Sequence, residues 1–358
     1  MELSLDDHIL KAYGLQKEHL KISQVGSGLI NRTYLISSSA TTRQYILQNI
    51  NTEVFRQPQL IADNLRLIAA YLHLEHPDYL FIKPVKTTSD EEMVHLDNEY
   101  WRMLPFVANT VSLDVLTTEK QAYEAARQFG KLSRMLDGFE AHKLHATIPD
   151  FHNLSLRYDQ FALALKKADH KLKVPAEEEI ERAIDYRHIL EYFNSFQHRQ
   201  DFPDRVMHHD TKISNVLLNK QNNEGICVID LDTIMPGKFL SDLGDMIRTY
   251  TCAFSENETD LSKIKIRISY FEALIKGYLS EMKSILTETE KELILFSGKY
   301  MVYMQALRFL TDFLNGNPYY PIQYPQQNLD RARNQFKLLQ ELYHNEKELQ
   351  DIIEENLI

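Results

Sequence analysis

A strand-turn-strand pattern that follows a short polar segment constrains the fold of this chain more than any other feature of its sequence. The polar segment HHDTKISN begins at residue 208 and leads into two apolar runs, VLL and ICVIDL. Between these runs, NKQNNEG contains the Asn and Gly residues that favour hairpin turns. Because an antiparallel hairpin returns its second strand to the start of its first, we predict that Asp230 lies beside Asn215 and Asp210.

Carboxylate and amide groups in this arrangement suit phosphoryl transfer, which needs a carboxylate near the attacking hydroxyl group and oxygen ligands for magnesium. Asp210 is the candidate base, and Asn215 and Asp230 are the candidate metal ligands. Asp232 is a candidate for tuning the site from behind these ligands. Each residue taken singly is also explained as a turn, cap or strand-end residue. Their order and the hairpin favour an ATP-dependent phosphotransferase.

Two adjacent histidines and two cysteines require a separate explanation. His208 and His209 stand next to Asp210, but neighbouring side chains on an extended segment point in opposite directions, which makes joint metal ligation awkward. We therefore predict that His208 braces the loop. Cys227 and Cys252 show no paired spacing, so neither a disulfide framework nor a zinc site is indicated.

Several segments resemble a known superfamily. DTKISNV, CVIDLDTIMPG and SDLGDMIR resemble the catalytic loop and metal-binding strand of the aminoglycoside phosphotransferase and choline kinase-like superfamily. YWRMLPF, IPDFHN, ALRFLTDFL and NLDRARNQFKL resemble its N-acetylhexosamine 1-kinase branch, so the resemblance spans nearly the whole chain. It implies an α+β, bilobal protein-kinase-like fold. A small, mostly antiparallel β lobe with a helix is expected at 1–104 for the nucleotide, and a large, mainly α-helical lobe at 105–358 for catalysis and the acceptor. ATP and Mg²⁺ are the implied cofactors.

The resemblance also implies a nucleotide site built largely from backbone groups. A glycine-containing loop is expected within VGSGLINRTYLI, where Gly26, Ser27 and Gly28 would let backbone amides approach the phosphates. A short G-S-G between apolar strands is also typical of an ordinary hairpin turn. Backbone groups around Pro105 and Val107 are implied to read the adenine edge.

One position departs from the kinase pattern. Gln48 in the strand RQYILQN occupies the place where kinases carry a phosphate-binding lysine. An amide hydrogen-bonds a phosphate oxygen but brings no positive charge, so magnesium, Arg32 or Arg43 is expected to supply it. Asp63 lies where a family acid would, and a solvated charge on a helix face is the alternative. The helix beginning near Val54 is predicted to pack its apolar side on the small sheet.

The acceptor is expected in the large lobe. The resemblance implies that Asp242 organises the active site or the acceptor, whereas a cap of the following helix is the alternative. Arg308 and Tyr319 match residues that line the sugar pocket in the N-acetylhexosamine branch, and an arginine fork with a phenol suits polar hydroxyl and amide groups. Both residues would otherwise only brace the loop NGNPYYP. Apolar residues at three- and four-residue steps predict helices over 119–136, 268–282, 291–314 and 329–357.

Composition narrows the class of protein. The chain has 358 residues, of which 44% are hydrophobic, enough for a sizeable core. Its net charge of -11 argues against a general nucleic-acid or membrane-surface role, so small-molecule partners are expected. No long uncharged apolar run is present, and the beginning MELSLDD lacks a secretory n-region, which indicates a cytoplasmic enzyme without a membrane span.

The resemblance to the N-acetylhexosamine branch, together with the residues above, implies a sugar kinase that phosphorylates the anomeric hydroxyl group of an N-acetylhexosamine or a related hexose. Two alternatives remain open. The acceptor could be an aminoglycoside, a choline-like amino alcohol or methylthioribose. The chain could also be a nucleotide-binding regulator that has lost catalysis, as Gln48 hints, although retention of Asp210, Asn215 and Asp230 speaks against this.

Overall fold

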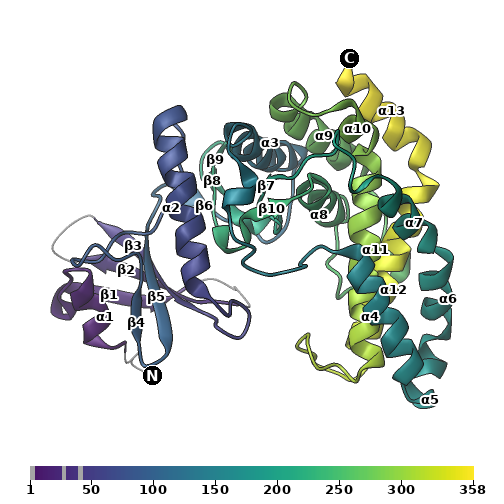
Figure 1. Ribbon diagram of the computed structural model, residues 1–358, viewed down its shortest axis with the longest axis horizontal. Coiled ribbons are helices and arrows are strands. Elements are labelled where there is room, and N and C mark those ends of the chain that lie inside the picture. The colour runs from purple at the N-terminus through teal and green to yellow at the C-terminus, as the bar shows by residue number, and fades with distance from the viewer. Residues whose placement is uncertain (1–4, 26–29, 39–42) are drawn as a thin grey trace.

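The computed structural model describes residues 5–25, 30–38 and 43–358. A small part rich in strands adjoins a larger, mainly helical part, which confirms the expected bilobal α+β fold (Figure 1). The strands are β1 (Leu20–Gln24), β2 (Arg32–Ser38), β3 (Gln44–Ile50), β4 (Val94–Leu96), β5 (Glu99–Pro105), β6 (Thr110–Val111), β7 (Arg205–Met207), β8 (Val216–Asn219), β9 (Gly225–Val228) and β10 (Met235–Gly237). The α-helices are α1 (Asp7–Ala12), α2 (Pro58–Glu75), α3 (Glu119–Met135), α4 (Leu154–Lys167), α5 (His170–Lys173), α6 (Glu177–Asp185), α7 (Arg187–Phe196), α8 (Leu240–Tyr250), α9 (Ile268–Met282), α10 (Glu288–Glu292), α11 (Ile294–Leu314), α12 (Gln327–His344) and α13 (Glu346–Leu357).

In the described residues, the small part is built on an antiparallel sheet in the order β1-β2-β3-β5-β4. Because side chains alternate along a strand, each face of the sheet receives every second residue. Tyr34, Leu47 and Met103 lie on the face that packs with Leu10 of α1 in a buried cluster. The opposite face carries a row of polar residues at the same level of the sheet.

Helix α2 differs from the sequence prediction in its start and in its packing. It begins at Pro58, whose fixed φ and missing N–H suit the first helical turn, and not near Val54. Its buried side chains, instead of packing on the small sheet alone, join the main core shared with the helical part. The buried Asn64 accepts a hydrogen bond from His145 N at 2.8 Å and donates to Ile234 O at 2.9 Å. This helix therefore connects the small sheet to the larger part.

The predicted hairpin is present in the large part. β8 and β9 pair antiparallel, with Val216 opposite Val228 and Leu217 opposite Cys227. The helices predicted over 119–136 and 268–282 form as α3 and α9, whereas those over 291–314 and 329–357 are each divided in two. The first is divided because Leu293 ends α10 before α11 begins, and the second because Asn345 ends α12.

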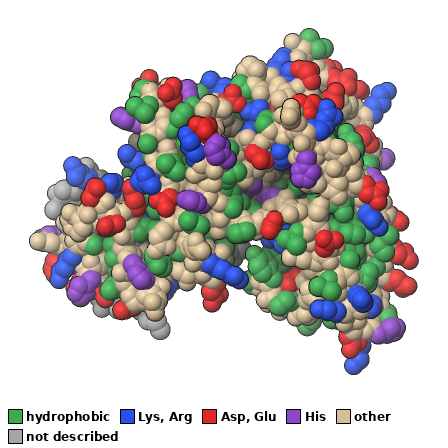
Figure 2. All heavy atoms as spheres, in the orientation of Figure 1, with side chains coloured by type: hydrophobic (Ala, Val, Ile, Leu, Met, Phe, Trp, Pro, Cys, Tyr) green, Lys and Arg blue, Asp and Glu red, His purple; other side chains and the backbone are tan. Residues whose placement is uncertain are grey.

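The surface shown in Figure 2 carries basic and acidic side chains interspersed, without a broad area of one sign. Within the described ranges, none of the helices has both the length and the apolarity required to cross a membrane.

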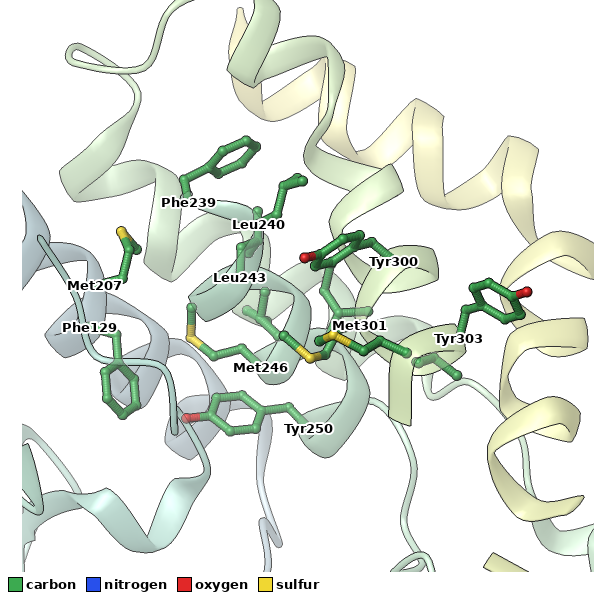
Figure 3. Packing of buried hydrophobic residues seen from close by; sticks show 14 of the residues in the cluster. Phe129, Met207, Phe239, Leu240, Leu243, Met246, Tyr250, Tyr300, Met301 and Tyr303 are labelled. Atoms are coloured by element: carbon green, nitrogen blue, oxygen red, sulfur yellow. The ribbon is translucent and has the colours of Figure 1, made fainter. Parts of the chain in front are cut away.

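Helix α11 forms the centre of the main core, and α8 packs closely against it. Leu243 and Met246 of α8 point into the same buried region as Met301 of α11 (Figure 3). Gly244 permits this approach, because a Cβ atom at that position would lie 2.3 Å from the carbonyl oxygen of Ser297. The position of α8 is thus fixed by backbone contact as well as by side chains.

The substitution Gly244→Ala is expected to destabilise the protein by about 1–3 kcal/mol, because the added methyl group forces α8 away from α11. Urea unfolding of the variant measures this cost. Gly316→Ala is the control: Gly316 has a φ of +86° but open space around it, so only backbone strain of roughly 1 kcal/mol is added. Equal stability of the Gly244 variant and the wild type would contradict the packing argument.

Candidate active site

His208 fixes the start of the loop that carries Asp210. Its imidazole is buried, and its Nδ1 accepts a hydrogen bond from Asp210 N at 3.2 Å. This contact assigns the ring proton to Nε2, which donates to Ile229 O at 3.0 Å. His208 thereby ties the loop to the residue before Asp230, which confirms the prediction that it braces the loop.

Two carboxylates of α8 hold the backbone of the same loop. Asp242 accepts hydrogen bonds from His208 N at 2.9 Å and from His209 N at 2.7 Å, one on each oxygen. Asp245, one turn further along α8, accepts from Thr211 N at 3.0 Å. Arg248 donates to the other oxygen of Asp245 at 2.9 Å and thus neutralises a buried charge. These bonds anchor three amide groups of the loop on one helix.

The backbone adopts an unusual conformation on both sides of the site. His209 has a φ of 67° and Asp230 a φ of 58°, in the left-handed region that non-glycine residues rarely adopt. Each such residue costs on the order of 1 kcal/mol, and surrounding bonds must hold it in place. For His209, the bond to Asp242 is one of these.

The structure brings the three residues predicted for catalysis and metal binding together. Asn215 Nδ2 donates to the Asp210 carbonyl oxygen at 2.8 Å and to Asp210 Oδ2 at 3.0 Å. Lys212 Nζ also lies 2.9 Å from Asp210 Oδ2. Ile229 N donates to Asn215 O at 2.9 Å, which places the following residue, Asp230, at the same edge of the hairpin.

Asn215 and Asp230 fit a magnesium ion. Because the nitrogen of the Asn215 amide faces Asp210, its oxygen remains for a cation. Asp230 keeps an accessible surface, yet desolvation by surrounding atoms and then the carboxylates of Asp232 and Asp210 raise its pKa to about 7, as expected where negative charges converge. The described residues contain no group of three or more acidic, His or Cys ligands. Magnesium is commonly held by one or two carboxylates together with substrate phosphates, so this sparse set is sufficient.

The residues predicted for the nucleotide phosphates are only partly described. Gly26, Ser27 and Gly28 lie outside the described residues. Gln48 is half-buried on β3, where its Oε1 accepts two hydrogen bonds from Arg102.

Three further residues were predicted for the nucleotide site. Pro105 ends β5, opposite Tyr45 of β3, and the Val107 carbonyl oxygen accepts from Thr110 Oγ1 at 2.7 Å. Asp63 is 43% exposed and pairs with Arg66 at 3.0 Å, as in the alternative of a solvated helix charge. The predicted roles of these residues stay predictions.

The residues predicted for the acceptor lie in different settings. Both oxygens of the buried Asp242 are used by the loop, so its geometry here is that of a support. Arg308 donates to Gln305 at 3.2 Å, and its guanidinium carbon lies 5.5 Å from the ring centroid of Phe151. Tyr319 is 66% exposed in the loop after α11. An acceptor-binding role for these residues stays a prediction.

Sequence reasoning missed Asp245, Arg248 and Arg102. Asp245 and Arg248 could have been found from the sequence. Asp242 and Asp245 are three residues apart at the start of a helix and so lie on one face, and Arg248 follows three residues later. No sequence pattern indicated Arg102, because its contacts depend on which strand pairs with β3.

A model of the phosphotransferase enzyme family matches residues 21–280, about three quarters of the chain. The chain belongs to this family. It is therefore an ATP-dependent small-molecule kinase that phosphorylates a hydroxyl group and uses Mg²⁺. The match confirms the superfamily that the motifs resemble.

Solved structures of phosphotransferases have the same fold as this kinase. A microcompartment-associated aminopropanol kinase is 15% identical, with a TM-score of 0.67 over 94% of this chain and 96% of that chain. A spectinomycin phosphotransferase in complex with ADP and spectinomycin is 14% identical, with a TM-score of 0.62 over 95% and 97%. A Plasmodium vivax ethanolamine kinase is 13% identical, with a TM-score of 0.56 over 89% and 82%. At these identities the likeness shows the fold.

The substitution Asp242→Asn is expected to destabilise the kinase by about 1–3 kcal/mol, because one loop amide then faces an NH₂ group in place of an oxygen. Burial raises the pKa of Asp242 to about 6, above its usual value of about 3.9. The native state therefore binds this proton more tightly than the unfolded chain does. The stabilisation that Asp242 contributes is therefore complete at pH values below its pKa in the unfolded chain. It is lost as the pH rises through its pKa in the folded protein.

It follows that the difference in stability between wild type and Asp242→Asn should be larger at pH 5 than at pH 7, by about 1 kcal/mol. Urea unfolding at both pH values measures it. Asp204→Asn removes a carboxylate that is 63% exposed and serves as the control. A difference that stays constant or shrinks toward pH 5 would contradict the assignment.

Proposed function

We propose that this kinase transfers the γ-phosphoryl group of ATP to the anomeric hydroxyl group of an N-acetylhexosamine (N-acetylglucosamine or N-acetylgalactosamine) or a related hexose. The proposed transfer of a phosphoryl group is supported chiefly by one observation: Asp210, Asn215 and Asp230 lie together at one edge of the hairpin. As part of the proposal, residues 1–104 bind the nucleotide and residues 105–358 carry catalysis and the acceptor.

Asp210 is the proposed base. The contacts that the described residues make with its carboxylate fall on Oδ2, which faces Asn215 and Lys212. Oδ1 then accepts the proton of the acceptor hydroxyl group as that oxygen attacks phosphorus. Asn215 Oδ1 and the Asp230 carboxylate would hold magnesium, which screens charge on the phosphate oxygens. The bonds from α8 keep the loop in place during this transfer.

The surroundings of Arg308 support an uncharged acceptor. Arg308 lies over the rings of Phe151 and Tyr320, at 5.5 and 5.6 Å from their centroids. Arg157 donates to the carbonyl oxygen of Phe151 at 3.0 Å, and burial and then the charge of Arg308 lower its pKa. Two guanidinium groups near one another repel a cationic acceptor such as an aminoglycoside or a choline-like amino alcohol. They suit hydroxyl and acetamido oxygens, and Tyr319 adds a phenol nearby.

The acceptor is tested with the purified kinase, ATP and magnesium. We expect ADP release with N-acetylhexosamines or free hexoses, and little with choline, methylthioribose or kanamycin. Phosphorus NMR of the product then locates the phosphate, which is expected at the anomeric oxygen. Turnover only on a cationic acceptor would replace the proposed substrate while keeping the mechanism. Nucleotide binding without turnover on any acceptor would favour the non-catalytic regulator that Gln48 hints at.

Replacement of the base gives a second test. Asp210→Asn should lower kcat by about two to four decades, the usual contribution of a positioned base, because the amide cannot take the proton. ADP affinity should stay at the wild-type value, since this carboxylate does not bind the nucleotide. Rates are measured with the best acceptor of the panel, and Asp90→Asn, at an exposed carboxylate, is the matched control. Turnover of the Asp210 variant within a few-fold of wild type would reject Asp210 as the base.

A further inference from the structure

Three polar residues form a row across the small sheet. Thr33 of β2 is the register partner of Gln48 of β3, and Gln48 is the partner of Arg102 of β5. Cross-strand partners lie on one face of a sheet. Leu47, which precedes Gln48 on β3, and Met103, which follows Arg102 on β5, point to the other face and are buried in the cluster with α1. The polar row therefore faces away from α1.

Arg102 connects this row to the catalytic part. Its Nε and Nη2 donate to Gln48 Oε1 at 3.0 and 2.8 Å. Its Nη1 lies 2.5 Å from Asp232 Oδ1, and both side chains of this ion pair are only 2% exposed. Asn31 Nδ2 donates to the other oxygen of Asp232 at 2.8 Å. Asp232, two residues after Asp230, thus holds β5 and the segment before β2 beside the predicted metal ligand.

Arg32, one of the groups considered for the missing positive charge, and Asp63, the candidate for the family acid, are both directed elsewhere. Arg32 donates to Asn49, which is adjacent to Gln48, so the Asn49 side chain points to the opposite face of the sheet. Arg32 also pairs with the half-buried Glu99. Asp63, at the position of the family acid, pairs with Arg66 on its own helix. Arg102 and Asp232 instead form a buried ion pair next to Gln48.

We propose that Arg102 is the positioning residue that provides the positive charge of the nucleotide site in place of the lysine absent at Gln48. Two guanidinium donors on Oε1 determine which end of the Gln48 amide is free to donate. Gln48 Nε2 then points away from Arg102 and donates to Thr33 Oγ1 at 3.3 Å, a long bond that a phosphate oxygen can replace. In the buried ion pair, the guanidinium also polarises this amide and holds Asp232 beside Asp230.

Relative to a kinase with a lysine, the cation has moved from β3 to β5, and its acidic partner has moved from the helix to the turn after β9. The inference rests on the nucleotide half of the proposed function and does not depend on the acceptor. Binding of ADP with magnesium, measured by calorimetry on the full chain, therefore tests it apart from turnover. A wild-type protein that bound no ADP would reject the kinase function itself.

A charge exchange between the two strands gives the decisive test. Arg102→Gln should weaken ADP binding by roughly tenfold or more, as expected for loss of a charge-assisted contact, and should lower the melting temperature of the free protein. The double variant Gln48→Lys/Arg102→Gln places a cation at the usual lysine position and should return ADP affinity to within about threefold of wild type. Gln48→Lys alone should not improve binding, because its ammonium group faces Arg102.

Arg32→Gln is the matched control, since it removes an arginine from the opposite face of the same sheet, and ADP affinity should not change. If Arg102→Gln does not fold, the double variant decides alone: the proposal requires it to fold and to bind ADP. Wild-type ADP affinity in a folded Arg102→Gln protein would overturn the proposal. A double variant that folds but binds ADP as weakly as Arg102→Gln would overturn it as well.

Discussion

The active-site loop depends on the carboxylates that α8 directs at its backbone amides. Asp242 and Asp245 together accept hydrogen bonds from three residues between His208 and Thr211. The Asp210 N–H group has its acceptor within the loop, on His208, whereas these three N–H groups find theirs on α8. The loop also contains a left-handed residue, His209, that would otherwise relax. Helix α8 therefore serves as the template on which Asp210 is placed. Asp242, which resembles an acceptor-organising residue in the sequence, here binds backbone amides of the protein itself.

Helix α8 can position the loop only if the helix itself is held in place, and its packing in the core holds it. Gly244 lets the backbone of α8 approach α11, and the buried Tyr250 at the end of α8 donates to Thr211 O at 2.9 Å. Packing of α8 and hydrogen bonding of the loop are thus coupled: a shift of the helix changes the loop amides together. This coupling explains why polar groups occur within an otherwise apolar core, since a fully satisfied buried network specifies one arrangement.

Much of the fold was predictable because it depends on local patterns. The hairpin of β8 and β9 follows from turn residues between apolar runs, and α9 was predicted with the bounds it has. The site was predictable to the extent that residues close in sequence form it, as Asn215 and Asp210 do. The link between Arg102 and Gln48 was not, because it depends on β5 being inserted next to β3, and strand order is a tertiary property. The packing of α2 on the main core was missed for the same reason.

The charges at the site favour the proposed binding of a cation there, even without a lysine on β3. Asp210 pairs with Lys212 and Asp232 pairs with Arg102, whereas none of the ion pairs between described residues includes Asp230. Desolvation and then the carboxylates of Asp232 and Asp210 raise the pKa of Asp230, because a third negative charge is unfavourable at this place. A divalent cation held by Asp230 would remove that cost and would still have charge left for phosphate oxygens. In this kinase the paired arginine and lysine keep two acids in place, and the remaining acid, Asp230, is the one proposed to bind the metal.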